Sequence, residues 1–317
     1  MSYHEVTFNT FDGVEIHARV YPAAQNGPGV VMCPGFKCVL TMLNLPECAT
    51  ALQQRGITTV LYDPRNTGRS KGQPRDEIDP PQAVSDISDA LTYLIGLPSV
   101  DATAAGLFGI SFGGTVALSA SALDPRACFT VAVAPVSDFD FASPAQRARI
   151  LLKCVQDRES QALGNEAFSI PLVNDRGENA AGFGHGYDAN KYKKLLDEKR
   201  EVAPGHVNRI TMMTYYKVAM WTPWPLWELM GALDRKSSDE RGYGFGVMFV
   251  IPTADRVSYP EKQRYYFDKA GGGNCRKAKM EVEGAGHEDV LGESYLDTIV
   301  DEILKFLENL RKGDDSF

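Results

Sequence analysis

The sequence lacks three features that would assign it to a membrane, secreted or nucleic-acid-binding class. Residues 1–20 have neither the basic start nor the continuous apolar stretch of a signal peptide, and nowhere do about 18 apolar residues run together as a membrane span requires. Lys and Arg number 33 against 41 Asp and Glu, which gives a formal net charge of -8. Nucleic acid and anionic membrane surfaces call for clustered cations. We therefore expect a soluble, cytoplasmic protein with a neutral or apolar substrate, no nucleic-acid partner and no membrane insertion.

The sequence also lacks paired cysteine spacings. Its six cysteines are scattered and form no CxxC pair: Cys33, Cys38, Cys48, Cys128, Cys154 and Cys275. This pattern predicts neither a zinc site nor a disulfide framework. We expect the cysteines to be free thiols, most of them buried. We expect no metal and no cofactor.

What the sequence does contain is an alternation of apolar runs and helical stretches. The turn signal at Asp12-Gly13 lies between two segments of period-two alternation, which predicts an antiparallel hairpin. Six short apolar runs then follow, at 29–33, 58–62, 104–110, 128–134, 246–251 and 278–282. Buried parallel strands joined by crossover helices have this pattern, so the sequence predicts a mostly parallel α/β sheet flanked by helices.

One connection in this pattern is far too long for an ordinary loop. Between the fourth and fifth apolar runs lie residues 139–241, which are not strand-like and which we interpret as an inserted, mainly helical lid. The expected organisation is a core of residues 1–138 and 242–317 with this lid between its two parts.

The stretch GLFGISFGG, residues 106–114, places Ser111 between two glycines, directly after an apolar run and before a helical segment. Glycines at 109 and 113 remove side chains that would clash in a sharp strand-to-helix turn, and such a turn lifts the serine hydroxyl above the sheet edge. A glycine-rich turn can also serve packing alone. The context of strand, serine and helix favours a nucleophile.

A serine nucleophile needs a histidine base and an orienting carboxylate, which in this arrangement follow it in the chain. His287 lies in a glycine loop after the last predicted strand, whereas His185 and His206 fall inside the insertion. Asp255 follows the penultimate strand and is the favoured acid. Asp138 and Asp140, which follow the strand at 128–134, are its rivals, and a helix-capping role is the alternative for Asp255.

Acyl transfer also requires hydrogen-bond donors for the tetrahedral oxyanion. The backbone N–H of Phe112, the residue after the nucleophile, is one candidate. The second is the N–H of Phe36, in the glycine turn CPGFK that follows the strand at 29–33.

The segments GISFGG, CPGFK, PTADR and GAGHE, together with the loop DPRNTGRS at 63–70, resemble the α/β-hydrolase superfamily over essentially the whole chain. Many of those relatives carry a histidine where this chain has Pro34. At a finer level HEVTF, CPGFKCVLTM and YDPRNTGRS are similar to fungal serine hydrolases encoded beside polyketide synthases, which include polyketide transferases and thiohydrolases. This resemblance implies that Ser111 takes an acyl group from an ester or a carrier-bound polyketide thioester, with a polyketide synthase as partner. We interpret Arg65 and Asp63 in the DPRNTGRS loop as structural.

The insertion concentrates large apolar side chains in one segment, including Met212, Tyr216, Trp221, Trp224 and Trp227. Such side chains suit a long acyl group, so we predict that they line the substrate pocket. They could equally form the core of the lid, because spacing alone does not tell inward from outward.

Three functions compete at this point. The first is a hydrolase or acyltransferase with an acyl-serine intermediate, acting on an ester or thioester. The second is a peptidase of the same fold, and the third is a catalytically silent binding protein, which the complete set of candidate catalytic residues disfavours. The sequence leaves open the acyl chain, the acceptor and the oligomeric state, a homodimer included.

Overall fold

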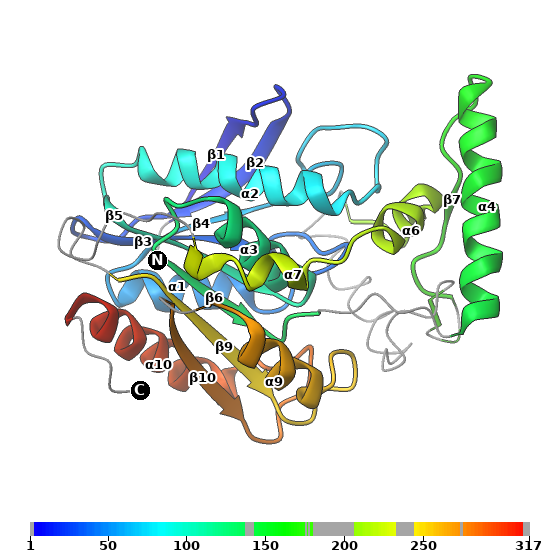
Figure 1. Ribbon diagram of the computed structural model, residues 1–317. Coiled ribbons are helices and arrows are strands. Elements are labelled where there is room, and N and C mark those ends of the chain that lie inside the picture. Colours follow the sequence, from blue (N-terminus) through cyan, green and yellow to red (C-terminus); the bar gives the residue numbers. More distant parts are fainter. Residues whose placement is uncertain are drawn as a thin grey trace.

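An eight-stranded sheet forms the centre of the molecule in a computed structural model that describes residues 3–136, 143–174, 176, 178–179, 206–232, 244–272 and 275–312. Its strands are β1 (His4–Asn9), β2 (Glu15–Tyr21), β3 (Gly27–Cys33), β4 (Thr58–Tyr62), β5 (Val100–Ile110), β6 (Phe129–Val133), β9 (Gly246–Pro252) and β10 (Arg276–Val282). Their order across the sheet is β1-β2-β4-β3-β5-β6-β9-β10 (Figure 1). β2 is antiparallel to β1 and to β4, and all other neighbours are parallel. The predicted hairpin and mostly parallel sheet are confirmed.

Helices cover both faces of this sheet. α2 (Pro80–Ile95), α3 (Phe112–Leu123) and α9 (Pro260–Lys269) pack on one face, and α1 (Leu45–Gln54) and α10 (Glu293–Lys312) on the other. Every residue of β4, β6 and β9 is buried, which is the property that made these strands appear in the sequence as continuous apolar runs. Along β9, Val247 and Phe249 face α3 and α9, whereas Met248 and Val250 face α10.

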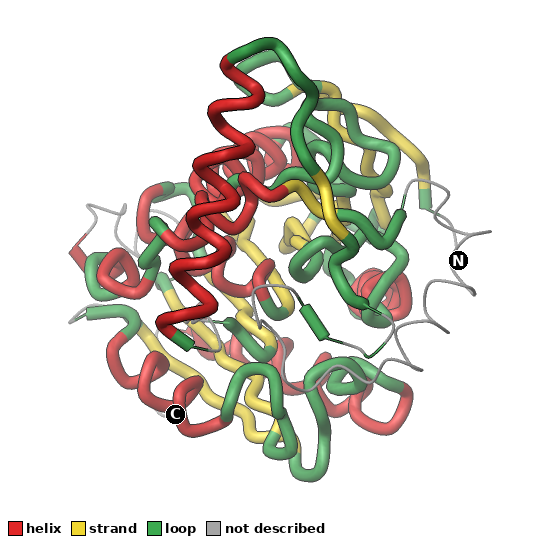
Figure 2. Tube along the Cα trace, turned by 90° about the vertical axis from the view of Figure 1, so that its right-hand side faces the viewer, coloured by secondary structure: helices red, strands yellow, loops and turns green. Residues whose placement is uncertain are grey.

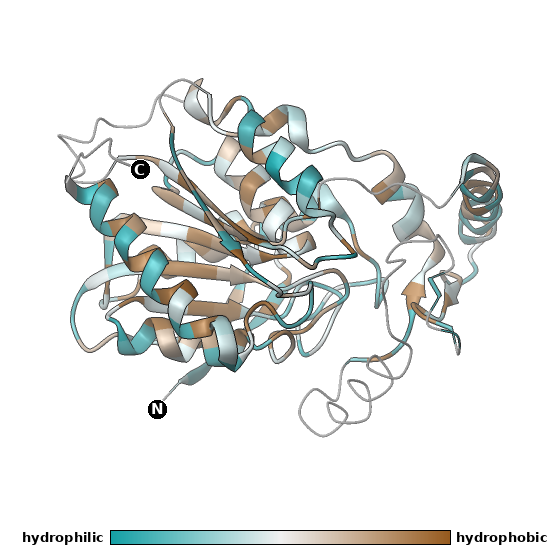
Figure 3. Ribbon diagram, turned by 90° about the horizontal axis from the view of Figure 1, so that it is seen from below, coloured by the Kyte–Doolittle hydropathy of each residue, from teal (hydrophilic) through white to brown (hydrophobic). Residues whose placement is uncertain are grey.

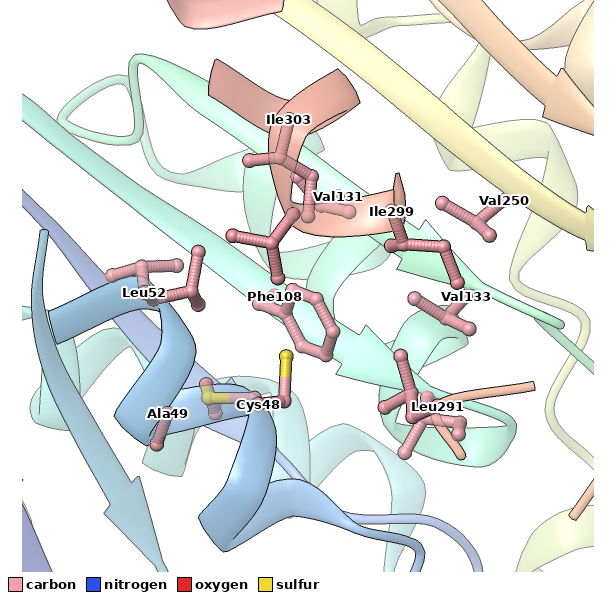
Figure 4. Packing of buried hydrophobic residues seen from close by; sticks show 14 of the residues in the cluster. Cys48, Ala49, Leu52, Phe108, Val131, Val133, Val250, Leu291, Ile299 and Ile303 are labelled. Atoms are coloured by element: carbon pink, nitrogen blue, oxygen red, sulfur yellow. The ribbon is translucent and has the colours of Figure 1, made fainter. Parts of the chain in front are cut away.

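The core beneath α1 and α10 fixes the strand that carries the predicted nucleophile. Phe108 of β5 lies between Cys48 and Leu52 of α1 and Ile299 and Ile303 of α10 (Figure 4). Phe108 is 1 % exposed. Close packing around so large a ring leaves β5 little freedom to move, so the residues at its carboxyl end are held in place.

The segment between β6 and β9 contains helices and, against the expectation, two short strands. In the described residues of this segment, the elements are α4 (Pro144–Ala162), β7 (Ser169–Ile170), β8 (Ile210–Thr211), α6 (Met212–Ala219), α7 (Trp224–Trp227) and the 3-10 helix η1 (Met230–Ala232). β7 and β8 form an antiparallel pair of two residues each, too short to leave a periodic pattern in the sequence. α4 stands at the margin of the molecule, beside α6 (Figures 1 and 2).

All six cysteines are free thiols, and five of them are buried. Among the helices that the structure describes, none combines the length and the apolar character needed to span a bilayer.

Candidate active site

Ser111 lies at the turn between β5 and α3, at the carboxyl edge of the sheet. Its φ of 58° and ψ of -125° form a positive-φ conformation that non-glycine residues rarely adopt and that occurs at functional turns. A Cβ at Gly109 would lie 2.0 Å from the carbonyl oxygen of Gly113, and one at Gly113 would lie 2.2 Å from that of Cys33. Both clashes are with backbone, which cannot move aside. The two glycines are therefore required by the sharpness of the turn, as the sequence predicts.

Ser111, His287 and Asp255 form a continuous hydrogen-bonded chain. The Ser111 Oγ lies 2.8 Å from Nε2 of His287, and Nδ1 of His287 lies 2.8 Å from Oδ2 of Asp255. The three residues are 8 %, 9 % and 3 % exposed, respectively. Three residues that the sequence separates by up to 176 positions are thus brought into direct contact.

The acceptor-only chemistry of a carboxylate sets the tautomer of His287. Because ionised Asp255 can only accept, Nδ1 of His287 must carry the hydrogen of their shared bond. Nε2 of the neutral ring then has a lone pair, and the Ser111 hydroxyl donates to it. This is the arrangement in which a histidine can remove a serine proton.

Asp255 is held by four hydrogen bonds. Oδ1 accepts from the backbone N–H groups of Val257 and Ser258 at 2.8 and 2.9 Å, and Oδ2 accepts from Gln263 Nε2 at 3.0 Å in addition to His287. Gln263 is fully buried on α9 and also donates to the Ser258 carbonyl at 2.6 Å. The carboxylate therefore has one fixed orientation. Sequence reasoning missed Gln263, because a single glutamine in a helical segment matches no motif.

The loops that carry Asp255 and His287 are joined to each other by backbone hydrogen bonds. Thr253 N–H donates to the Val282 carbonyl at 3.0 Å, and Ala254 N–H donates to the Ala285 carbonyl at 2.9 Å. These bonds continue the register of β9 and β10 beyond the ends of the strands. The acid and the histidine therefore keep their separation because the two loops form one unit.

The glycine turn after β3 lies against the serine turn. A Cβ at Gly35 would lie 3.4 Å from Ser111 Cβ, and the ring of Phe36 meets the ring of Phe112 edge to face at 5.6 Å. Phe112 is the first residue of α3, where the helix dipole favours negative charge. Both predicted oxyanion donors, the N–H groups of Phe36 and Phe112, therefore belong to residues adjacent to Ser111.

A buried ion pair anchors this glycine turn from behind. Lys37 follows Phe36 with a φ of 59°, and its fully buried Nζ donates to Oδ1 of Asp76 at 2.5 Å. Burial lowers the pKa of Lys37 below its usual value, and the nearby Asp76 opposes that shift. The other oxygen of Asp76 accepts from Nε of Arg209 at 2.7 Å. Asp76 thus joins the turn to the segment that contains α6.

The DPRNTGRS loop has the structural role that the sequence suggests. Arg65 forms ion pairs with Asp86 and Asp12 at 2.6 and 2.8 Å. Asp63 accepts from the backbone N–H groups of Leu40 and Arg69. These contacts tie the loop to α2, to the hairpin and to the segment before α1.

The five apolar residues predicted to line the pocket occupy different environments. Trp221 is half-buried and meets the ring of Phe112 at 5.8 Å, which places it beside the serine turn. Tyr216 lies under the guanidinium of Arg158, 5.9 Å from its ring centre, and so faces α4.

Met212 and Trp227 are 1 % and 0 % exposed, in packed clusters. Half-buried Trp224 lies 6.4 Å from Tyr266 on α9. The position of Trp227 does not support the predicted role in substrate binding, because its indole is enclosed by core residues and donates to Ser119 Oγ at 3.1 Å.

The rival residues are only partly within the described structure. His206 is buried, with 6 % of its surface exposed. His185, Asp138 and Asp140 lie outside the described residues. In the ranges that the structure describes, no three His, Cys, Asp or Glu side chains gather as a metal site would require.

A small cavity lies behind the glycine turn, beneath Phe112. Its volume is about 30 Å³, and Cys33, Lys37, Tyr62 and Asp86 are among the residues that line it. This is room for one or two water molecules, not for an acyl chain.

Comparisons with known proteins agree with the fold. The family model described as "Alpha/beta hydrolase family" matches residues 30–302. The chain is similar to a thiohydrolase of Eupenicillium brefeldianum, with 37 % identity over 96 % of this chain and 94 % of the relative. It is also similar to the polyketide transferase af380 of Aspergillus fumigatus, with 34 % identity over 97 % and 98 % of the two chains.

Among solved structures, the complex of DcsB with its substrate analogue is similar at a TM-score of 0.86 and 35 % identity, covering 98 % of this chain and all of the other. The fold, the family match and the similarity over nearly the whole chain therefore agree. The chain belongs to the α/β-hydrolase family, and it is an enzyme of that superfamily.

Proposed function

We propose that this enzyme transfers acyl groups through an acyl-serine intermediate on Ser111, with His287 as general base and Asp255 as the residue that orients it. The observation that carries the proposal is the pair of 2.8 Å contacts that connect Ser111, His287 and Asp255. Hydrogen-bond contact between nucleophile, base and orienting acid is the geometry by which such a triad is recognised.

In the first half of the reaction, His287 Nε2 takes the hydroxyl proton as Ser111 Oγ attacks the acyl carbonyl carbon. The resulting oxyanion accepts hydrogen bonds from the N–H groups of Phe112 and Phe36, close to the positive end of α3. When the tetrahedral intermediate collapses, the carbon–sulfur or carbon–oxygen bond breaks. The leaving thiolate or alkoxide takes the proton from His287, and the acyl group remains on Ser111 as an ester.

In the second half, water or an alcohol donates its proton to His287 Nε2 and attacks the acyl-serine carbonyl. Collapse of the second tetrahedral intermediate returns the proton to Ser111 Oγ and releases an acid or a new ester. The names of the relatives, thiohydrolase and polyketide transferase, support a polyketide thioester as the donor. The same names cover both kinds of acceptor, so both belong to the proposal.

Intact-protein mass spectrometry tests the proposal directly. Mixed with an octanoyl thioester of pantetheine, the wild-type enzyme should gain one octanoyl mass, and Ser111→Ala should gain none. Water and a panel of small alcohols offered to the adduct then identify the acceptor by the rate at which the added mass disappears. An adduct of equal yield on both proteins would place the nucleophile elsewhere.

A further inference from the structure

We propose that the outward face of α4 is a docking surface for an acidic acyl carrier domain, which delivers its thioester to Ser111. This inference rests on the proposed function and adds a partner to it. The surface is defined by seven residues: Ala148, Leu152 and Val155 along its centre, Arg147 and Arg158 along one side, and Arg149 and Lys153 along the other.

The face is exposed and amphipathic. Of the 19 residues of α4 only Ile150, Cys154 and Asp157 are buried, and they share one side of the helix. At 3.6 residues per turn the opposite side carries Ala148, Leu152 and Val155 in a line that ends at exposed Glu159. Leu152 and Val155 are 60 % and 44 % exposed. An apolar stripe bordered by cations on both sides is a recognised pattern for partner binding.

The charge of this face differs from that of the rest of the chain. The formal net charge is -8, and several described arginines elsewhere are ion-paired, including Arg55, Arg65, Arg126 and Arg264. In the described part of the chain, Arg149 and Lys153 have no carboxylate within ion-pair distance. Two cations without an ion pair, beside an apolar stripe, complement an acidic partner and speed its association.

The first turn of α4 contacts the end of α6, which leads toward the candidate active site. Nη2 of Arg147 lies 3.5 Å from the carbonyl oxygen of Ala219, the last residue of α6. Two residues further on, Trp221 meets the ring of Phe112, which directly follows Ser111. α6 lies between the sheet and α4, on the same side of the molecule as α4 (Figures 1 and 3). A domain bound there would extend its flexible prosthetic arm past α6 toward the serine.

A second copy of the chain and a lipid surface fit this face less well. In a two-fold dimer the same patch meets itself, so four cations would face four cations. The centre of the stripe carries no aromatic side chain, which binding to a lipid interface favours. An acidic carrier brings no cations against this face and needs no aromatic anchor.

The test compares two donors of the same acyl group, an octanoyl-loaded acyl carrier domain of a polyketide synthase and octanoyl-pantetheine. In the double variant Arg149→Glu/Lys153→Glu, the KM for the carrier-bound donor should rise about tenfold or more, because like charges then face each other. kcat/KM for octanoyl-pantetheine should stay within about twofold, since the catalytic residues are untouched. Leu152→Asp should weaken use of the carrier in the same selective way. Lys305→Glu, at an exposed position of α10, is the charge-reversal control and should change the use of neither donor.

Carrier binding is measured separately from turnover, so that the docking surface and the proposed function are tested by different readouts. Fluorescence anisotropy of the labelled carrier domain should show binding to the wild type that weakens with salt and is lost in Arg149→Glu/Lys153→Glu. Equal carrier affinity in both proteins would overturn the docking surface. So would a wild-type dimer that Leu152→Asp dissociates, or charge-dependent binding to anionic vesicles with unchanged carrier affinity. Carrier binding without acylation from either donor would instead contradict the proposed function.

Discussion

The two ends of the segment 206–232 are attached to the sheet domain by opposite kinds of contact. Around α6 the contacts are polar: Ile78 N–H donates to Thr214 Oγ1 at 2.9 Å, and Lys217 forms ion pairs with Glu77 and Asp79 at 2.8 and 2.7 Å. At α7 the attachment is apolar. Trp227 is fully buried between α3 and α9, with its ring 5.8 Å from that of Tyr266.

This difference separates three tryptophans that look alike in the sequence. Trp227 is part of the core, and half-buried Trp224 packs near Tyr266, on the side of α9. Trp221 lies between the two attachments and contacts Phe112. We infer that Trp227 contributes to stability and that Trp221 contributes to the choice of substrate. Substitutions can separate the roles of the catalytic residues, of the apolar attachment at α7, of the polar attachment at α6 and of Trp221.

The largest effects are expected outside both attachments, at His287 and, somewhat smaller, at Asp255. Asp255→Asn should lower kcat about 10⁴-fold, because an amide can no longer fix the tautomer of His287. His287→Ala should cost about as much as loss of the serine. Both variants should unfold in urea at concentrations close to the wild type. If Asp138→Asn proved far more damaging than Asp255→Asn, the acid would be misassigned.

Loss of the apolar attachment should appear as lost stability. Trp227→Ala should lower the free energy of unfolding by about 3–5 kcal/mol, because it leaves a cavity in a packed cluster. Trp227→Phe, which keeps most of the ring but removes the N–H donor to Ser119, should cost about 1–2 kcal/mol. Urea titrations measure both values. A stable Trp227→Ala enzyme with altered acyl-chain preference would restore Trp227 to the pocket.

Asp76 also belongs to the polar attachment, because it pairs with Arg209 of the segment 206–232. Its loss should affect both stability and turnover. Asp76→Asn leaves the buried ammonium of Lys37 without its counter-ion, at a cost of about 3 kcal/mol. Because Lys37 follows Phe36, kcat should fall equally for acetyl and octanoyl esters. The control is Arg209→Gln, which removes the exposed partner of the same carboxylate and should cost no more than about 1 kcal/mol. Equal losses in the two variants would show that the buried pair has no special role.

The smallest effect is expected at Trp221. Trp221→Ala should lower kcat/KM for octanoyl esters about 10- to 100-fold, since burying an aromatic side chain against the acyl group contributes about 1.5–3 kcal/mol. Turnover of acetyl esters, which should be poor substrates for the wild type, should hardly change. A loss of the same size for both esters would show that Trp221 does not contact the acyl chain.

Sequence reasoning succeeded where a local rule carries the structure. The buried strands follow from continuous apolar runs, and the turn at Ser111 follows from glycines at 109 and 113, where a Cβ would strike backbone. Chain order and strand ends limited the choices for base and acid to His287 and Asp255, whose side chains lie 2.8 Å apart in the structure. Contacts between distant segments left no such signal. The partner of Lys37 lies 39 residues away, and Gln263 belongs to a helix with no motif.

The apolar residues of the insertion show a different limit. Their spacing gives the helix face but not the neighbour that covers it, so Trp221 and Trp227 could not be told apart. The net charge of the whole chain likewise hides local differences in charge. It predicts an acidic molecule as a whole but averages out the basic face of α4.

The central claim is that Ser111, activated by His287, forms the covalent bond to the acyl group. A fluorophosphonate probe tests it most directly, because the probe reacts with an activated serine and leaves a stable adduct. The account predicts rapid labelling of the wild type at Ser111, very slow labelling of His287→Ala and none of Ser111→Ala. Labelling of Ser111→Ala at the wild-type rate would contradict it.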